Sequence, residues 1–235
     1  MANEQPHRVA LYWAPRPDDA LWRTGSHWLG RDAANGQRLK QPAVEGVEPA
    51  LFDALTADPR RYGWHATLKP PFRMADGVTL DQVDEATERL ARSWRVTALP
   101  PLRVASLGRF LALRPQGPMD TVNQMAADCV RRLHALARPQ SSEELARRRH
   151  PAMTARQNDL LQRWGYPWVL EEFRFHCSLT GPLASLDEPQ TASVTAAAQR
   201  LFDGLPAPTM DSVALFVEPV PGGDFRLHRH WSLSA

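Results

Sequence analysis

The chain has 235 residues, a formal net charge of +2 and 43% hydrophobic residues, so it can bury a core as one large domain or two small lobes. The small net charge excludes the strong positive field that attracts long nucleic acids. Two cysteines are too few for a disulfide framework, and no apolar run approaches the ~20 residues that span a bilayer. Residues 1–6 contain no apolar signal segment, so we expect a cytoplasmic protein without a membrane partner.

The first part of the chain alternates strand and helix patterns. The run of apolar residues at 8–13 predicts a strand, and the prolines that follow closely indicate where it ends. Helices are expected at 21–29 and 48–58, with a polar, glycine-rich loop between them. The segment 25–32 has spaced glycines but lacks the Lys-(Ser/Thr) ending of a P-loop, so we reject a P-loop there.

The remaining elements follow from apolar periodicity and turn residues. Helices are expected at 79–95, 120–137, 142–164 (broken at Pro151) and 187–202, and strands at 102–107, 109–113, 213–217 and 225–233. The basic run at 147–150 is expected to be a solvated helix end.

A short motif, His-x-(Ser/Thr)-Leu, occurs in two strand-like stretches. Residues two apart in a strand point to the same face, so His65 should lie beside Thr67, and His176 beside Ser178. Cys177 should point away into the packed interior. A phosphodiester needs a base, an acid and donors for its oxygens, and these four side chains supply that set. We therefore predict them as catalytic residues.

The order of elements repeats, because each motif is followed by a helix and then by a pair of strands. This predicts an α+β fold in which residues 1–235 form a single bilobed domain, with two antiparallel sheets backed by helices. The motifs at 65–68 and 176–179 would line the central cleft. A third copy of the motif begins at His230, close to the end of the chain, where fraying disfavours a fixed catalytic geometry.

Four stretches, 28–32, 62–72, 164–167 and 172–181, resemble the 2H phosphoesterase superfamily. They are closest to the bacterial branch encoded in phosphonate-utilisation operons beside carbon–phosphorus lyase genes. One departure is Cys177-Ser178, where Met-Thr is expected, although serine keeps the hydroxyl. The resemblance implies a bilobed pseudo-symmetric fold and opening, or the reverse, of cyclic or 2′,5′ phosphodiesters without a metal or cofactor. It also implies a small cyclic phosphate, sugar phosphate or nucleotide as substrate, with 5-phosphoribosyl 1,2-cyclic phosphate as the natural candidate and a short RNA end as the alternative.

Further phosphate groups would need cations, because arginine and lysine recognise phosphate oxygens. Lys69 is in phase with His65 and Thr67, and Arg174 is in phase with His176 and Ser178, so both are expected to face the cleft. The set of predicted substrate-binding residues is Lys69, Arg174, Arg31, Arg109 and Tyr12.

Three other interpretations remain open. His228 and His230 could bind zinc together with a motif histidine, although catalytic zinc usually has three protein ligands. The cleft could bind a nucleotide or sugar phosphate without turning it over. Both motifs could be core strands whose histidines are bonded internally. The sequence assigns neither the acid and base roles, nor the direction of the reaction, the oligomeric state or the role of residues 138–165.

Overall fold

The structure is a computed structural model that describes residues 5–235, so the expectation about residues 1–6 falls largely outside it. One seven-stranded sheet runs through the molecule in the order β4-β5-β6-β2-β1-β8-β9, and all its pairings are antiparallel. The strands are β1 (Arg8–Trp13), β2 (Ala66–Phe72), β4 (Leu102–Leu107), β5 (Phe110–Pro115), β6 (Cys177–Ser178), β8 (Ser212–Glu218) and β9 (Arg226–Ser232). A ribbon of β3 (Thr97–Ala98) and β7 (Thr209–Met210) has no counterpart among the predicted strands.

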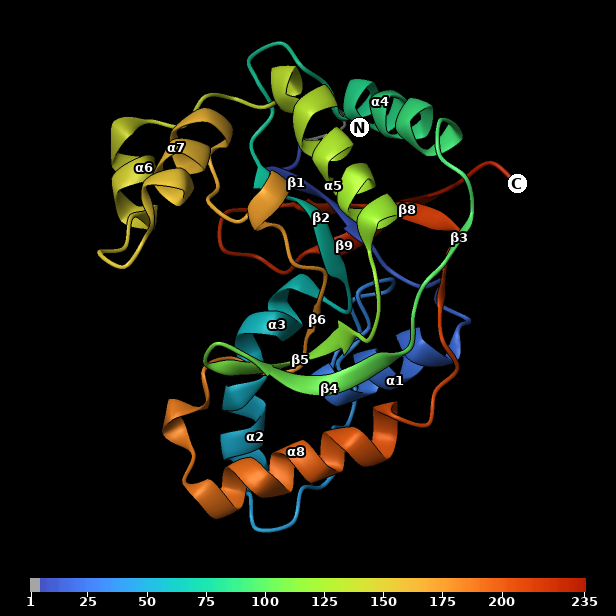
Figure 1. The fold of residues 1–235 in the computed structure, drawn as a ribbon, viewed down its shortest axis with the longest axis vertical. Coiled ribbons are helices and arrows are strands. Elements are labelled where there is room, and N and C mark those ends of the chain that lie inside the picture. Colours follow the sequence, from blue (N-terminus) through green and yellow to red (C-terminus); the bar gives the residue numbers. More distant parts are fainter. Residues whose placement is uncertain (1–4) are drawn as a thin grey trace.

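The helices lie in two groups, one over each half of the sheet (Figure 1). The upper group contains α4 (Leu80–Arg92) and α5 (Asp120–Arg132), with α6 (Ser142–Arg148) and α7 (Ala155–Trp164) at one side. The lower group contains α1 (Ala20–Leu29), α2 (Pro49–Leu55), α3 (Ala57–Tyr62) and α8 (Glu188–Phe202). The predicted bilobed α+β architecture is therefore correct, except that the two sheets are continuous.

Each lobe combines parts of both halves of the chain. Helix α4 follows the first motif but packs against β8 and β9, which follow the second motif. Helix α8 follows the second motif but packs against β4, which follows the first. The repeated order of elements is present in the chain, yet neither repeat folds as a lobe by itself.

Most predicted helices are present, and local signals explain where they begin. Thr79 caps α4 with a reciprocal capping box, and the expected break at Pro151 separates α6 from α7. The single helix predicted at 48–58 is two helices that continue to Tyr62. Pro59 is compatible with this because it lies in the first turn of α3, where its missing N–H costs nothing. No helix within residues 5–235 has the length and apolarity needed to cross a bilayer.

Strand β2 continues beyond the first motif through Pro70 and Pro71 to Phe72. The reason is its position in the sheet. Its neighbour β6 pairs with β2 only at Ala66, so that edge is open along the rest of the strand. Proline lacks an N–H and is tolerated at such an edge.

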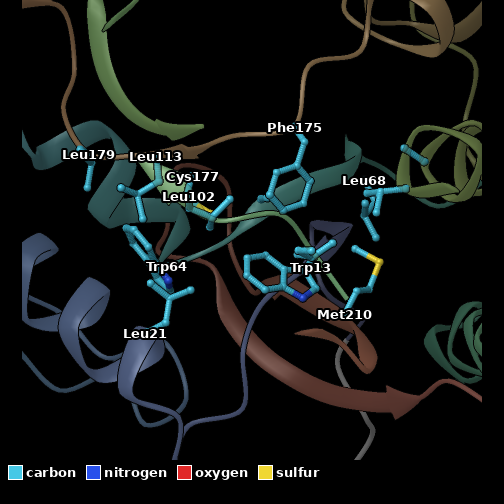
Figure 2. Close-up of a cluster of buried hydrophobic side chains, with 14 of the residues drawn as sticks. Trp13, Leu21, Trp64, Leu68, Leu102, Leu113, Phe175, Cys177, Leu179 and Met210 are labelled. Carbon is cyan, nitrogen blue, oxygen red and sulfur yellow. The ribbon is translucent and has the colours of Figure 1, made fainter. Parts of the chain in front are cut away.

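The main hydrophobic core lies behind the two motifs (Figure 2). Leu68, Cys177 and Leu179 are almost fully buried in it, which confirms that Cys177 points into the interior. Trp13 of β1 contacts Phe175, with ring centroids 5.4 Å apart. The residues on either side of each motif histidine are thereby anchored in the core, which leaves the imidazoles on the opposite face.

Candidate active site

The two motifs meet where β2 and β6 pair. Ala66 lies opposite Cys177, and in an antiparallel pair this register sets His65 opposite Ser178 and Thr67 opposite His176. All four side chains then point to one face, because alternate residues of a strand do so. Each histidine faces the hydroxyl residue of the other motif, which is the arrangement of a local two-fold axis.

The two imidazoles are held in the same way. His65 Nδ1 is 2.9 Å from the carbonyl oxygen of Gly63, and His176 Nδ1 is 2.7 Å from the carbonyl oxygen of Arg174. A carbonyl only accepts, so Nδ1 carries the proton in both rings. The Nε2 atom of each histidine is thereby left to exchange a proton with a ligand.

Burial makes the two histidines electrostatically different. His65 stacks on the ring of Tyr12 at 3.8 Å, and burial lowers its pKa to about 4, although the bond to Gly63 raises it and His176 lowers it slightly more. The pKa of His176 is also lowered, first by burial, with the Arg174 carbonyl raising it and the positive charge of Arg114 lowering it. His65 is therefore the stronger candidate for a neutral base.

The two hydroxyl residues are partly buried beside the imidazoles. Thr67 Oγ1 lies 3.2 Å from His65 Nε2, so it donates a hydrogen bond to that nitrogen in the neutral ring. Ser178 pairs with Ala112 of β5. The register places both hydroxyl residues on the face of the two imidazoles.

The loop before His65 has a fixed shape. Gly63 has φ +81°, a conformation that favours glycine, and a Cβ there would lie 2.5 Å from the side chain of Ala33. Arg31 holds the same loop by donating hydrogen bonds to the carbonyl oxygens of Arg60, Arg61 and Phe225. These contacts position the Gly63 carbonyl that fixes the tautomer of His65.

The prediction that Arg31 binds substrate is therefore not supported by its position. Its side chain is almost completely buried, and its Nε and one terminal nitrogen donate to backbone carbonyls at the end of α3 and of Phe225. Tyr12 is likewise fully buried and touches the imidazole of His65. Arg31 supports the segment before His65, and Tyr12 packs against the imidazole of His65.

Lys69 points to the opposite face from the one predicted. Tyr12 pairs with Thr67, but Leu11 pairs with Lys69, so β2 has one extra residue at this point. Such a bulge reverses the alternation of side chains, and Lys69 shares the face of Leu11, on which α5 packs. The prediction that Lys69 shares a face with His65 and Thr67 is therefore wrong.

The other two predicted cations lie at the surface. Arg174 is exposed, and its guanidinium donates to the carbonyl oxygens of Glu171 and Phe173 in its own segment. Arg109 is exposed at the turn between β4 and β5. A contact of either residue with substrate remains a prediction.

Arg114 is a cation of this site that the sequence patterns did not indicate. The register of β5 against β6 sets Ala112 opposite Ser178, so Arg114 lies on the same face, next to His176. The alternation of Phe110, Ala112 and Arg114 is visible in the sequence, but the pairing of β5 with β6 is not. Tyr62 is a second addition, since its ring centroid lies 6.2 Å from that of His65.

The third motif does not join the other two. His230 Nε2 lies 3.1 Å from the carbonyl oxygen of Ala14, and its ring faces Trp22 at 6.5 Å. His228 is exposed on β9. Among the described residues, no group of three or more histidine, cysteine or acidic side chains gathers in a way that would hold a metal ion.

The fold and site define a protein in which the register of β2 against β6 brings two histidines, related by a local two-fold axis, to one face of the sheet. The family described as "Protein of unknown function (DUF1045)" matches residues 67–226, and the chain belongs to this family. The matched range contains Thr67, His176 and Ser178, while His65 lies just before it.

Two curated relatives are similar over nearly the whole chain. Both are called "Ribose 1,5-bisphosphate phosphokinase PhnN". The protein of Janthinobacterium sp. (strain Marseille) is 36% identical over 228 residues, which is 96% of this chain and 50% of that protein. The protein of Laribacter hongkongensis (strain HLHK9) is 39% identical over 229 residues, 97% of this chain and 52% of that protein. The chain thus spans about half the length of these relatives.

Solved structures also align over almost the full chain. LigT of E. coli, in complex with NADP+, is 14% identical with a TM-score of 0.42, and the alignment covers 98% of this chain and 99% of LigT. A protein described as a phosphoesterase is 13% identical with a TM-score of 0.45, and the alignment covers 98% of this chain and 100% of that one.

Proposed function

We propose that the chain is a metal-independent phosphoesterase that opens, or in reverse forms, a cyclic phosphodiester of a small sugar phosphate or nucleotide. The observation that carries this proposal is the matched pair of imidazoles. His65 and His176 each bond through Nδ1 to the carbonyl two residues earlier, and each has Nε2 left for proton transfer. Positioned acids and bases of this kind contribute about 10² to 10⁴ in rate.

We infer the roles of the two histidines from their lowered pKa values. His65, whose pKa is about 4, takes a proton from water at Nε2 while the water oxygen forms a bond to phosphorus. The bond from phosphorus to one ring oxygen breaks, and His176, protonated at Nε2, gives its proton to that leaving oxygen. When substrate binds, the Thr67 hydroxyl turns from His65 Nε2 to a non-bridging oxygen, and Ser178 donates to the other. One water is consumed, and proton exchange with solvent restores both histidines.

The relatives suggest a substrate. A kinase named for ribose 1,5-bisphosphate needs that compound, and cleavage of the O2–P bond of 5-phosphoribosyl 1,2-cyclic phosphate yields it. The two reactions would therefore follow each other, which supports a role in phosphonate breakdown. We propose that the half of those relatives matched by this chain opens the cyclic phosphate and that the remaining half holds the kinase.

A kinase activity of this chain is the second candidate, because the relatives carry that name. The chain offers little for it: Gly25 and Ser26 lie inside α1, and Gly30 ends that helix with no lysine following. A P-loop needs its glycines in a loop before a helix and a lysine for the phosphates. Two other functions are non-catalytic binding of a sugar phosphate and action on a short RNA end. One assay separates these two, and kinase activity, from the proposed reaction.

The test is turnover in EDTA followed by phosphorus NMR. The substrates are 5-phosphoribosyl 1,2-cyclic phosphate, a 2′,3′-cyclic nucleotide, a short RNA with a cyclic phosphate end, and ribose 1,5-bisphosphate with ATP and Mg²⁺ (without EDTA). We expect opening of the first substrate, lost in both His65→Ala and His176→Ala and retained in His230→Ala. Turnover only with ATP, or activity that survives both motif substitutions, would overturn the proposal. If calorimetry detects binding of these compounds and none of them is turned over, the chain is a binding protein and not an enzyme.

A further inference from the structure

A polar pocket lies away from the two histidines. It has a volume of about 260 Å³ and is enclosed by the end of β2, the end of α5 and the segment that contains α6 and α7. None of the four motif side chains lines it. No aspartate or glutamate of the described residues lines the pocket. Five basic side chains line it: Lys69, His134, Arg138, Arg148 and Arg163.

Lys69 is the unusual member of this set. Its side chain is about 97% buried, with 3% of its surface exposed, and within residues 5–235 it forms neither a hydrogen bond nor an ion pair. Its ammonium lies 4.8 Å above the ring of Phe72, a cation–π contact that replaces only part of the lost hydration. A buried cation without an anion is unfavourable, so the site lacks the partner that its charge requires.

The electrostatics of the neighbours agree with this geometry. Burial lowers the pKa of Lys69 to about 8. Burial also raises the pKa of the Cys129 thiol far above its usual range, so this thiol stays neutral and supplies no negative charge. The pKa of His134 is lowered by burial and then by the charge of Lys69.

Two of the basic side chains already have acidic partners. Arg138 pairs with Glu144 at 3.5 Å, and Arg163 pairs with Asp159 at 2.8 Å. Arg148 has no carboxylate partner among the described residues, and its guanidinium lies 5.7 Å from the ring centroid of Tyr166. The basic run at 147–150 was expected to be solvated, but the structure turns Arg148 toward this pocket.

We propose that this pocket binds a phosphate group, with the ammonium of Lys69 at its base and the guanidinium of Arg148 at its side. Phosphate supplies the missing negative charge and several acceptor oxygens, and lysine and arginine are the side chains that bind it. The group belongs either to a distal end of the substrate held at the two histidines or to a separate phosphorylated molecule. The first of these two sources rests on the proposed function, whereas the binding of phosphate in this pocket does not.

The chain offers an internal control, because Lys40 and Lys69 are its only lysines and Lys40 is exposed. Lysine labelled with ¹⁵N at Nζ gives two resonances, which are followed against pH with and without inorganic phosphate. The protein is the His65→Ala/His176→Ala double variant, so that phosphate bound at the histidines adds no signal. We expect phosphate to raise the pKa of Lys69 from about 8 toward its ordinary value of 10.5 and to leave Lys40 unchanged.

Substitutions separate the two sources of the phosphate. Lys69→Met should weaken phosphate binding about tenfold or more, whereas Lys69→Arg, which keeps the charge, and Lys40→Met should bind as before. If the group is part of the substrate, Lys69→Met in the otherwise native chain raises KM for a bis-phosphorylated cyclic substrate and not for a cyclic mononucleotide. If it is a separate ligand, both KM values stay unchanged while phosphate binding is lost.

Two results would overturn the proposal, and neither depends on turnover. The first is a Lys69 Nζ resonance that does not respond to phosphate in protein whose melting curve shows it is folded. The second is a Lys69 that titrates at its ordinary value without phosphate, because that would mean a solvated side chain. Failure of the phosphoesterase assay alone leaves these measurements unaffected.

Discussion

Ala66 of β2 pairs with Cys177 of β6, and among the described residues this antiparallel pair is the point at which the two halves of the sheet join. The pair determines the distance between the two motifs, because His65 and His176 each precede one of its members. Neither residue carries any chemistry. Their register nevertheless places each imidazole opposite the hydroxyl residue of the other motif.

The first prediction concerns the pH dependence of kcat/KM. The active free enzyme has His65 neutral and His176 protonated, so activity should rise through the pKa of His65, about 4. It should fall through the pKa of His176, which is lowered from 6.5. The maximum of kcat/KM is expected between the two pKa values. A cyclic mononucleotide is used as substrate because it has no second phosphate group that titrates in this pH range. A profile that is flat from pH 5 to 9, with chemistry rate-limiting, would contradict the two-histidine mechanism.

The second prediction compares two arginines, one at each end of β5. Arg114 lies on the face of His176 and lowers its pKa, so Arg114→Ala should move the alkaline limb of the profile to higher pH. If Arg114 also binds the substrate phosphate, kcat/KM at the optimum should fall by about tenfold or more. Arg109→Ala, at the exposed turn, is the matched control and should leave the alkaline limb in place. Equal shifts in both variants would remove the specific role of Arg114.

The third prediction concerns stability in acid. The folded pKa of His65, about 4, is below its ordinary value of 6.5, so between these pH values the unfolded chain binds more protons than the folded one. The stability contributed by neutral His65 is therefore complete above pH 6.5 and is lost as the pH falls toward 4. The loss is up to roughly 3 kcal/mol in the free energy of unfolding. Denaturant unfolding at several pH values measures this loss. In His65→Gln the free energy of unfolding should depend less steeply on pH. An unchanged dependence would show that other groups cause the loss.

The fourth prediction tests the support behind His65. Trp64 stacks on Phe202 of α8 at 5.3 Å, and a Cβ on Gly25 of α1 would lie 1.9 Å from the Trp64 ring. Gly25→Ala should therefore destabilise the protein by about 1–3 kcal/mol or more through overpacking and lower kcat by displacing the adjacent histidine. Gly204→Ala, where a Cβ meets nothing within 4 Å, is the control for thermal melting and turnover. Unaltered melting and turnover in Gly25→Ala would show that Trp64 does not fix His65.

The sequence by itself determined the features that depend on residues near one another in the chain. Alternation along a strand predicts that His65 and Thr67 share a face and that Cys177 points into the core. The chemistry of proline predicts the break between α6 and α7. Capping signals such as Thr79 marked where helices begin. These are short-range effects, so a single chain shows them.

Only the tertiary structure decided which elements meet. The extra residue in β2 turned Lys69 away from the histidines, because a bulge depends on the partner strand and not on the strand's own pattern. The same holds for Arg114, which reaches His176 through the pairing of β5 with β6. It also holds for α4 and α8, which pack on strands from the opposite half of the chain. Pairings between distant residues are selected by the whole core, and their energetic gain appears only when the chain is folded.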